Sequence, residues 1–144
     1  EKIKKEEKGN GQPKSIFADI PKSLPGTLRA YELQKKAAKV GFDWDDVAPI
    51  WQKVEEEMAE FRAETSGGRR AALVGEFGDV LFALINLARY YDIQPEEALQ
   101  MANDKFTRRF AYIEEQVRKS GRLITSFSLA ELDRLWEEAK ENGR

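Results

Sequence analysis

The feature that most constrains the fold is an apolar segment, residues 72–88, that carries two acids three positions apart. Wound at about 100° per residue, it places Glu76, Asp79 and Asn86 on one narrow stripe of a helix. The rest of the circumference is mostly Leu, Val, Phe and Ile, and a helix of this kind is expected to be buried. Buried carboxylates are costly to ionise unless a cation meets them, and a metal ion is the simplest candidate.

Composition narrows the chemistry that this chain can perform. Its 144 residues suffice for one core, and it contains neither cysteine nor histidine. Nucleophilic triads, the usual zinc sites and thiolate ligands are therefore excluded. Any catalysis must rest on carboxylates, lysine, arginine and a hard metal that prefers oxygen ligands. The absence of cysteine also favours a cytoplasmic location.

The net charge and the hydropathy of the chain limit the kinds of partner that we expect. The net charge of −2 gives no electrostatic argument for binding a nucleic-acid polymer. We find no apolar run of the ~20 residues that span a membrane and no signal peptide, so no membrane partner is expected. The chain begins at Glu1 rather than Met, which is typical of a fragment or a processed chain.

Periodicity and helix breakers predict an all-α fold, a helical bundle of about five helices without strands. Residues 1–15 are polar and read as a flexible tail or interdomain linker, and residues 16–144 form the domain. The first predicted helix covers 27–40 and is ended by Gly41, and the second is capped by Asp45 or Asp46 and broken at Ser66-Gly67-Gly68. The third covers 69–91, and the fourth runs from Pro95 to Gly121. The fifth starts at Leu129, after a capping box formed by Ser128 and Glu131. The predicted core faces are Val47, Ile50, Trp51, Val54, Met58 and Phe61 on the second helix, and Leu99, Ala102, Phe106, Phe110, Ile113 and Val117 on the fourth.

Two carboxylate pairs, Glu57/Glu60 and Glu76/Asp79, have the spacing that places each pair on one helix face. If the second and third helices are antiparallel, the short Ser66-Gly67-Gly68 turn brings the pairs opposite each other. Four carboxylates with two Mg²⁺ ions would form a neutral site that can still accept phosphate oxygens. Taken alone, residues 55–57 are more often a solvated charge run.

A structural role for the acids of the third helix also stays open. Glu76 and Asp79 can pair with Lys105 or Arg109 as a buried salt bridge, and the pattern does not decide between this and a metal site. Lys105 and Arg109 are themselves either phosphate ligands or long side chains that lie over the core edge. Asn103 can orient a ligand or fill an ordinary polar edge position.

The tryptophans offer a similar choice. Trp51 is best explained as core, and Trp136 shares an apolar stripe with its helix neighbours, so packing is its default role. The alternative for Trp136 is a platform on which a base stacks.

These residues resemble a known family. The segments 54–60 and 76–82 are similar to the Glu-x-x-Glu … Glu-x-x-Asp signature of MazG-type nucleoside triphosphate pyrophosphohydrolases, with fifteen intervening residues between Glu60 and Glu76. The segments 20–25, 38–44 and 102–110 also resemble MazG blocks, and the resemblance covers roughly residues 16–140. Residues 3–9 resemble the end of a preceding repeat, which implies the C-terminal, catalytic half of a two-repeat protein whose upstream domain is missing here; fusion to a methylase domain is an alternative.

The resemblance implies an all-α, intertwined or tightly packed homodimer that hydrolyses nucleoside triphosphates to monophosphate and pyrophosphate with Mg²⁺, for which Mn²⁺ can substitute. Broad specificity that includes deoxy and non-standard nucleotides is expected. By position, the resemblance implies metal ligands Glu57, Glu60, Glu76 and Asp79, a further catalytic acid Glu56, and substrate-binding residues Asn103, Lys105, Arg109 and Trp136.

Two rival interpretations remain at this stage. One is a helical dimerisation or interaction module whose acids are paired structurally, which predicts neither magnesium dependence nor nucleotide binding. The other is a narrow-specificity pyrophosphatase that acts on dUTP or dCTP with the same acids.

Overall fold

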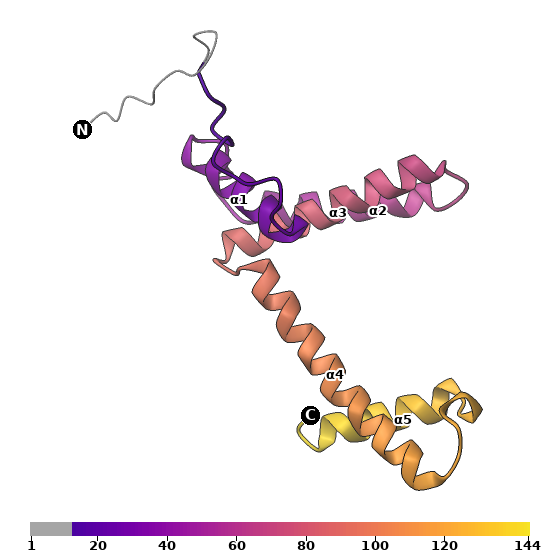
Figure 1. The fold of residues 1–144 in the computed structure, drawn as a ribbon. Helices are drawn as coiled ribbons and strands as arrows, with labels where there is room; N and C mark the ends of the chain where they lie inside the picture. The colour runs from indigo at the N-terminus through magenta and orange to yellow at the C-terminus, as the bar shows by residue number, and fades with distance from the viewer. Residues whose placement is uncertain (1–12) are drawn as a thin grey trace. The chain divides into compact units, whose positions relative to one another are not determined.

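The computed structural model describes residues 13–144, and within that range it is entirely helical (Figure 1). The elements are α1 (Gly26–Lys39), α2 (Ala48–Glu64), α3 (Arg70–Tyr90), α4 (Pro95–Ser120), the short 3₁₀ helix η1 (Ile124–Ser126) and α5 (Leu129–Glu141). The all-α prediction and the number of α-helices are confirmed. Most of the predicted tail, residues 1–12, lies outside the described residues.

The chain divides into two compact units, and the boundary falls between Glu96 and Glu97. The first unit contains α1, α2 and α3. The second contains nearly all of α4, together with η1 and α5. Each unit is built around its own small set of buried residues.

A two-glycine turn sets the geometry of the first unit. Gly67 has a φ of +125°, which only glycine adopts at low cost. A Cβ on Gly68 would lie 2.6 Å from the backbone oxygen of Glu64, so this position also excludes a side chain. The turn reverses the chain, and α2 and α3 pack side by side while α1 packs against α3 (Figure 1).

The core of the first unit is small. Its buried apolar side chains are Ile20, Tyr31, Ile50, Val54, Val80, Ala83 and Ile85. The prediction that the third helix is buried is wrong for this chain, because α1 and α2 cover only part of its circumference. Four apolar side chains on α3, spaced as one face of a helix, stay exposed: Val74, Phe77, Leu81 and Leu84, which we call the α3 apolar stripe.

Two side chains assigned to the core of α2 are also exposed. Trp51 is 46% exposed and Met58 is 55% exposed, because both lie to one side of the line along which α2 packs against α3. The polar edge of Trp51 forms a hydrogen bond, in which the indole Nε1 donates to the Tyr91 hydroxyl at 3.4 Å. Ile50 and Val54 do form the predicted core stripe.

The second unit is built from α4 and α5. Ile113, Val117 and Ala139 are buried, whereas Leu99, Ala102, Phe106 and Phe110 on the predicted core face of α4 are exposed. Since α5 is the one α-helix of this unit that contacts α4, it covers only part of that face. The contacts include Phe106 against Trp136, with ring centroids 5.5 Å apart, and a 3.0 Å hydrogen bond that the Tyr112 hydroxyl donates to Glu138.

The helix ends agree with the sequence in most places. Gly41 and Gly121 both have positive φ, as expected for residues that end helices, and Pro49 lies in the first turn of α2. The predicted cap of α2 is wrong. The N-cap is Val47 and no side chain caps it, because Asp46 lies one residue earlier and its carboxylate accepts the Val47 N–H.

One further expectation needs correction. Among the described residues, α3 is the one helix long and apolar enough to cross a membrane by length and composition. The sequence predicted no apolar run of the ~20 residues that span a membrane, whereas the 21 residues of α3 reach that length and composition with Glu76 and Asp79 included. In the structure α3 packs against α1 and α2, and both acids meet Glu57 of α2.

The start of α5 offers a direct test of the sequence-based interpretation. The Ser128 hydroxyl accepts the Glu131 N–H, and the Glu131 carboxylate accepts the Ser128 N–H. Hydrogen bonding from Arg122, and then from Ser128, lowers the pKa of Glu131 to about 2. We expect Ser128→Ala to cost about 1 kcal/mol of unfolding free energy, measured by urea denaturation. Thr125→Ala removes a hydroxyl from the preceding 3₁₀ helix and serves as the control; equal losses in the two variants would contradict the capping role.

Candidate functional site

Three carboxylates meet between α2 and α3. Glu57 comes from α2, and Glu76 and Asp79 come from α3. One carboxylate oxygen from each residue lies within 4.8 Å of the other two. The antiparallel arrangement made by the two-glycine turn therefore brings together three of the four predicted metal ligands. We call these three residues the acidic cluster.

Two oxygens of the acidic cluster are buried without a partner. Glu57 is only 7% exposed, and Glu76 is half-buried. Among the described residues, neither Glu57 Oε2 nor Glu76 Oε2 has a hydrogen-bond partner. Buried polar atoms are rarely left unsatisfied, and an unpaired carboxylate oxygen is especially costly. A ligand with positive charge is the simplest way to satisfy both.

Among residues 13–144, one cation reaches the cluster. Lys53, one turn earlier on α2, places its Nζ 2.9 Å from Glu57 Oε1 and 3.4 Å from Glu56 Oε2. Hydrogen bonds to Glu57 and then Glu56 raise the pKa of Lys53. A single ammonium group cannot neutralise three carboxylates, so the cluster keeps an excess of negative charge.

The fourth predicted ligand, Glu60, lies beside the cluster rather than in it. Its side chain is exposed, yet the negative charge of Glu57, followed by desolvation and the charge of Glu76, raises the pKa of Glu60. Glu56 is exposed as well, and Lys53 is its partner. Both residues add to the negative potential around the acidic cluster.

The donor set fits a divalent hard cation. Mg²⁺ and Mn²⁺ prefer carboxylate oxygens and bind through one or two carboxylates together with substrate phosphates. Glu57, Glu76 and Asp79 supply such oxygens from two rigid helices, and two of those oxygens are buried without a partner in the described chain.

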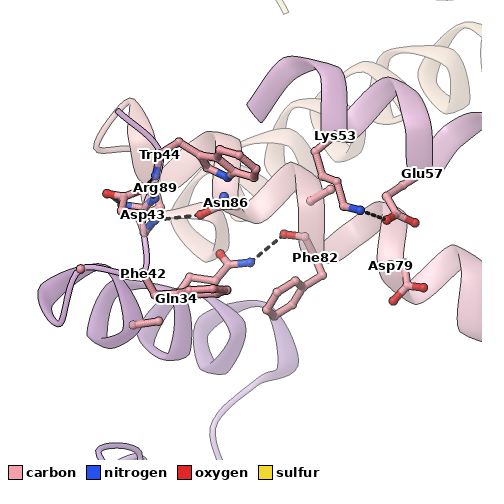
Figure 2. Close-up of a pocket in the computed structure, with 13 residues that line it drawn as sticks. Gln34, Phe42, Asp43, Trp44, Lys53, Glu57, Asp79, Phe82, Asn86 and Arg89 are labelled. Carbon is pink, nitrogen blue, oxygen red and sulfur yellow. Dashed lines mark hydrogen bonds and ion pairs between the residues drawn. The ribbon is translucent and has the colours of Figure 1, made fainter. Parts of the chain in front are cut away.

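A cavity of about 550 Å³ adjoins the acidic cluster. Glu57 and Asp79 belong to both, so the cavity and the cluster are continuous. We call it the α1–α3 cavity; it is lined by Gln34, Ala37, Gly41, Phe42, Asp43, Trp44, Lys53, Glu57, Asp79, Phe82, Ala83, Asn86 and Arg89. Figure 2 shows the acids and Lys53 at one side, Phe42, Asp43 and Trp44 at the other, and Gln34 and Phe82 between them.

A polar network holds the far side of this cavity. Arg89 makes a forked contact with Asp43, with N–O distances of 2.6 Å and 3.3 Å, and its Nε donates to Asn86 Oδ1 at 2.9 Å. The hydrogen bond from Arg89 lowers the pKa of Asp43. Forked arginine–carboxylate pairs fix geometry as well as charge, so this network anchors the 41–47 loop against α3.

The four predicted substrate-binding residues lie in the second unit. Arg109 stacks on Trp136, 5.2 Å from its ring centroid, and its Nε donates to the Arg144 carbonyl at 2.9 Å. Trp136 also packs against Phe106 and is half-buried. Asn103 and Lys105 are exposed on α4. The observed contacts of Arg109 within the second unit are thus with Trp136 and Arg144.

Sequence reasoning singled out Glu57, Asp79 and Asn86 but missed the other residues that line the α1–α3 cavity. Lys53 carried a recognisable signal, because it precedes Glu57 by four positions on one helix. Phe42, Asp43 and Trp44 belong to a segment that resembles MazG blocks, but the pattern assigned them no role. Gln34 and Arg89 gave no signal, since each meets the cavity through tertiary packing alone.

Fold and site together define a class of protein: a helical domain in which carboxylates from two antiparallel helices form a cluster that could hold a hard metal, beside a ligand-sized cavity. Comparison with known proteins makes this specific. The chain belongs to the family described as the MazG nucleotide pyrophosphohydrolase domain, whose family model matches residues 38–113. The match includes all the acids of the predicted signature.

Individual relatives agree with this family. The chain is 42% identical over 142 residues to the nucleoside triphosphate pyrophosphohydrolase of Escherichia coli K12, covering 97% of this chain and 54% of that protein. It is 39% identical over 140 residues to the nucleoside triphosphate pyrophosphohydrolase/pyrophosphatase MazG of Thermotoga maritima, covering 97% of this chain and 53% of that protein. It is 55% identical over 145 residues to the Bacillus subtilis protein YabN, covering 100% of this chain and 29% of that protein. The chain thus spans about half the length of the first two relatives.

Repulsion among the carboxylates of the site predicts that removing the charge of Glu60 stabilises the fold, and that this gain in stability depends on pH. Because the folded-state pKa of Glu60 is raised, ionising Glu60 weakens the fold, and stability falls as the pH rises through that pKa. We expect Glu60→Gln to raise the melting temperature at pH 7 without divalent metal, and the gain to vanish at acidic pH, where wild-type Glu60 is protonated. Glu55→Gln, at an exposed position of α2, is the control. An equal, pH-independent effect in both variants would refute the repulsion.

Proposed function

We propose that this chain hydrolyses nucleoside triphosphates to nucleoside monophosphate and pyrophosphate with the help of Mg²⁺, which Mn²⁺ can replace. The observation that carries the proposal is the convergence of Glu57, Glu76 and Asp79 beside the α1–α3 cavity in a chain of the MazG family. The Escherichia coli and Thermotoga maritima relatives are named as nucleoside triphosphate pyrophosphohydrolases, which supports the reaction class.

The proposed roles of the acids follow from their positions. Glu57, Glu76 and Asp79 would hold the metal, and Glu60 would complete the set from the exposed side. When bound, the metal would neutralise the triphosphate and acidify water. Glu56, next to Glu57 and hydrogen-bonded to Lys53, is the proposed further acid that accepts the proton of the attacking water.

The second unit supplies the remaining proposed contacts. Lys105 and Arg109 would bind the phosphate chain, Asn103 would orient it, and Trp136 is a candidate to stack on the base, for which the α1–α3 cavity is the alternative place. In the structure Arg109 already lies over the Trp136 ring, so the two residues would act as a pair.

The proposal also covers the range of substrates, the cellular location and the length of the whole protein. Broad specificity, which includes deoxy and non-standard nucleotides, is consistent with the aromatic cavity wall, and a narrow preference for dUTP or dCTP is the alternative that a substrate panel decides. A cytoplasmic location suits an enzyme of the nucleotide pool. The 54% coverage of the Escherichia coli relative supports a longer protein with a further domain upstream.

We also propose that the active form is a homodimer. The α3 apolar stripe contains four exposed side chains, and Met58 of α2 is exposed too. Exposed apolar patches of this kind mark interaction sites, and a second copy of the same helix face is the proposed occupant. The same observation favours the interaction-module interpretation, which differs in predicting no turnover.

The first test is catalytic. With excess Mg²⁺, we expect release of pyrophosphate and nucleoside monophosphate from a panel of triphosphates, and none in EDTA. Asp79→Asn is expected to lower kcat/KM by on the order of 1,000-fold, which corresponds to ~4 kcal/mol, while circular dichroism stays unchanged. Glu55→Gln should retain wild-type rates. Turnover by Asp79→Asn close to wild type would remove Asp79 from the metal site, and no turnover by the folded wild type would favour the interaction module.

The second test concerns the dimer. Sedimentation equilibrium is expected to give twice the chain mass, and Leu81→Lys is expected to weaken the dimer at least about 10-fold, because a buried unpaired charge is costly. Ser23→Lys introduces the same charge on an exposed loop residue outside the stripe and should leave the dimer intact. A monomeric wild type, or an unaffected Leu81→Lys dimer, would overturn the proposed interface.

A further inference from the structure

Gln34 of α1 is a buried polar residue that lines the α1–α3 cavity. It is 8% exposed, and its Nε2 donates to the backbone carbonyl of Phe82 at 2.8 Å. Its Oε1 has no hydrogen-bond partner among the described residues. Figure 2 shows this oxygen directed away from Phe82, toward the side of the cavity where Trp44 and Asn86 lie.

The amide orientation is fixed by chemistry as well as by packing. Turning the amide over would set Oε1 against the Phe82 carbonyl oxygen, and two acceptors repel each other. Gln34 therefore presents an acceptor, and not a donor, to the cavity. A buried acceptor without a partner is a cost that a ligand N–H group would remove.

The surroundings of Gln34 suit a flat aromatic ligand. Phe42 and Trp44 are 83% and 48% exposed, although both line the cavity, and Phe82 lies between them and the acids. Aromatic side chains left uncovered in this way are typical stacking partners for bases. The volume of about 550 Å³ lies within the range of small-molecule sites.

The α1–α3 cavity is continuous with the acidic cluster, and this determines how a nucleotide would be oriented in it. Glu57 and Asp79 line one side of the cavity, and Phe42, Asp43 and Trp44 lie at the other (Figure 2). A nucleotide whose phosphates lie at the acids would direct its base toward Gln34 and the aromatic residues. The Asp43–Arg89 pair fixes the loop that carries Phe42 and Trp44.

We propose that the α1–α3 cavity is the nucleobase subsite and that Gln34 makes it prefer bases with an exocyclic amino group at the recognised edge. This inference rests on the proposed function for the phosphate end of the site. Stacking accepts every base, whereas the fixed acceptor of Gln34 favours 6-amino and 4-amino bases over their oxo counterparts. The oxo form places a carbonyl oxygen where the amino donor stood, which repels Oε1.

The first experiment measures base binding without catalysis. ¹⁵N-labelled wild-type protein is titrated, in the absence of metal, with adenosine, inosine, cytidine or uridine, and the Gln34 side-chain amide and Trp44 indole signals are followed. We expect both signals to shift, with adenosine binding about 10-fold more tightly than inosine and cytidine more tightly than uridine by a similar factor. Because nucleosides carry no phosphate, this result does not depend on turnover.

Two variants separate selection from stacking. Gln34→Met removes the acceptor at similar side-chain volume and should bring both binding ratios close to one. Phe42→Ala, at an exposed position that folding does not need, should weaken all four nucleosides by about 10-fold and leave the ratios unchanged. Gln52→Met, at an exposed glutamine of α2 outside the cavity, should behave as wild type.

The same ratios are then measured as kcat/KM for ATP against ITP and for CTP against UTP. Equal values within each pair, or ratios that persist in Gln34→Met, would overturn the role of Gln34. Unshifted Gln34 and Trp44 signals with all four nucleosides, or signals that change only with protein concentration because a second copy fills the cavity, would overturn the subsite. Absent turnover together with the expected nucleoside shifts would instead reject only the proposed hydrolysis.

Discussion

The close approach of like charges between α2 and α3 is the constraint on which the rest of the first unit depends. A turn that excludes side chains at Gly67 and Gly68 makes the two helices antiparallel, and their packing brings Glu57, Glu76 and Asp79 within 4.8 Å of one another. Such an arrangement is unfavourable by itself, because the carboxylates repel and two of their oxygens are buried without partners in the described chain. Apolar contacts along α2 and α3, together with the Lys53–Glu57 ion pair, hold it in place.

The α1–α3 cavity complements this cluster in polarity. One side carries the negative charge of Glu57 and Asp79, and the other combines aromatic surface with the fixed acceptor of Gln34. The Asp43–Arg89 pair keeps the aromatic loop in register with α3, so the two sides stand at a fixed separation. The proposed phosphoryl-type transfer would require charge neutralisation and positioning, and the residues that would contribute to both stand on α2 and α3.

The sequence predicted what depends on local rules. Helix ends at Gly41 and Gly121, the capping box at Ser128 and the facing acids all follow from spacing along one helix, and the structure has them. The sequence failed where burial depends on which faces meet. Trp51, Met58, Leu99 and Phe106 have core-like spacing, yet they are exposed because no described neighbour covers them. Gln34 and Arg89 escaped notice for the converse reason, since only tertiary packing brings them to the cavity.

Three different faces of the helix α3 have separate roles. Glu76 and Asp79 meet Glu57 of α2, Phe82 and Asn86 line the cavity, and the α3 apolar stripe lies on a face that stays exposed. Each residue added to a helix turns everything beyond it by 100°. Loss of one residue between Asp79 and Phe82 would rotate the cavity wall away from the acids and split the apolar stripe into two faces. Descendants of this sequence can therefore exchange side chains along α3, but they can scarcely change its length in this interval.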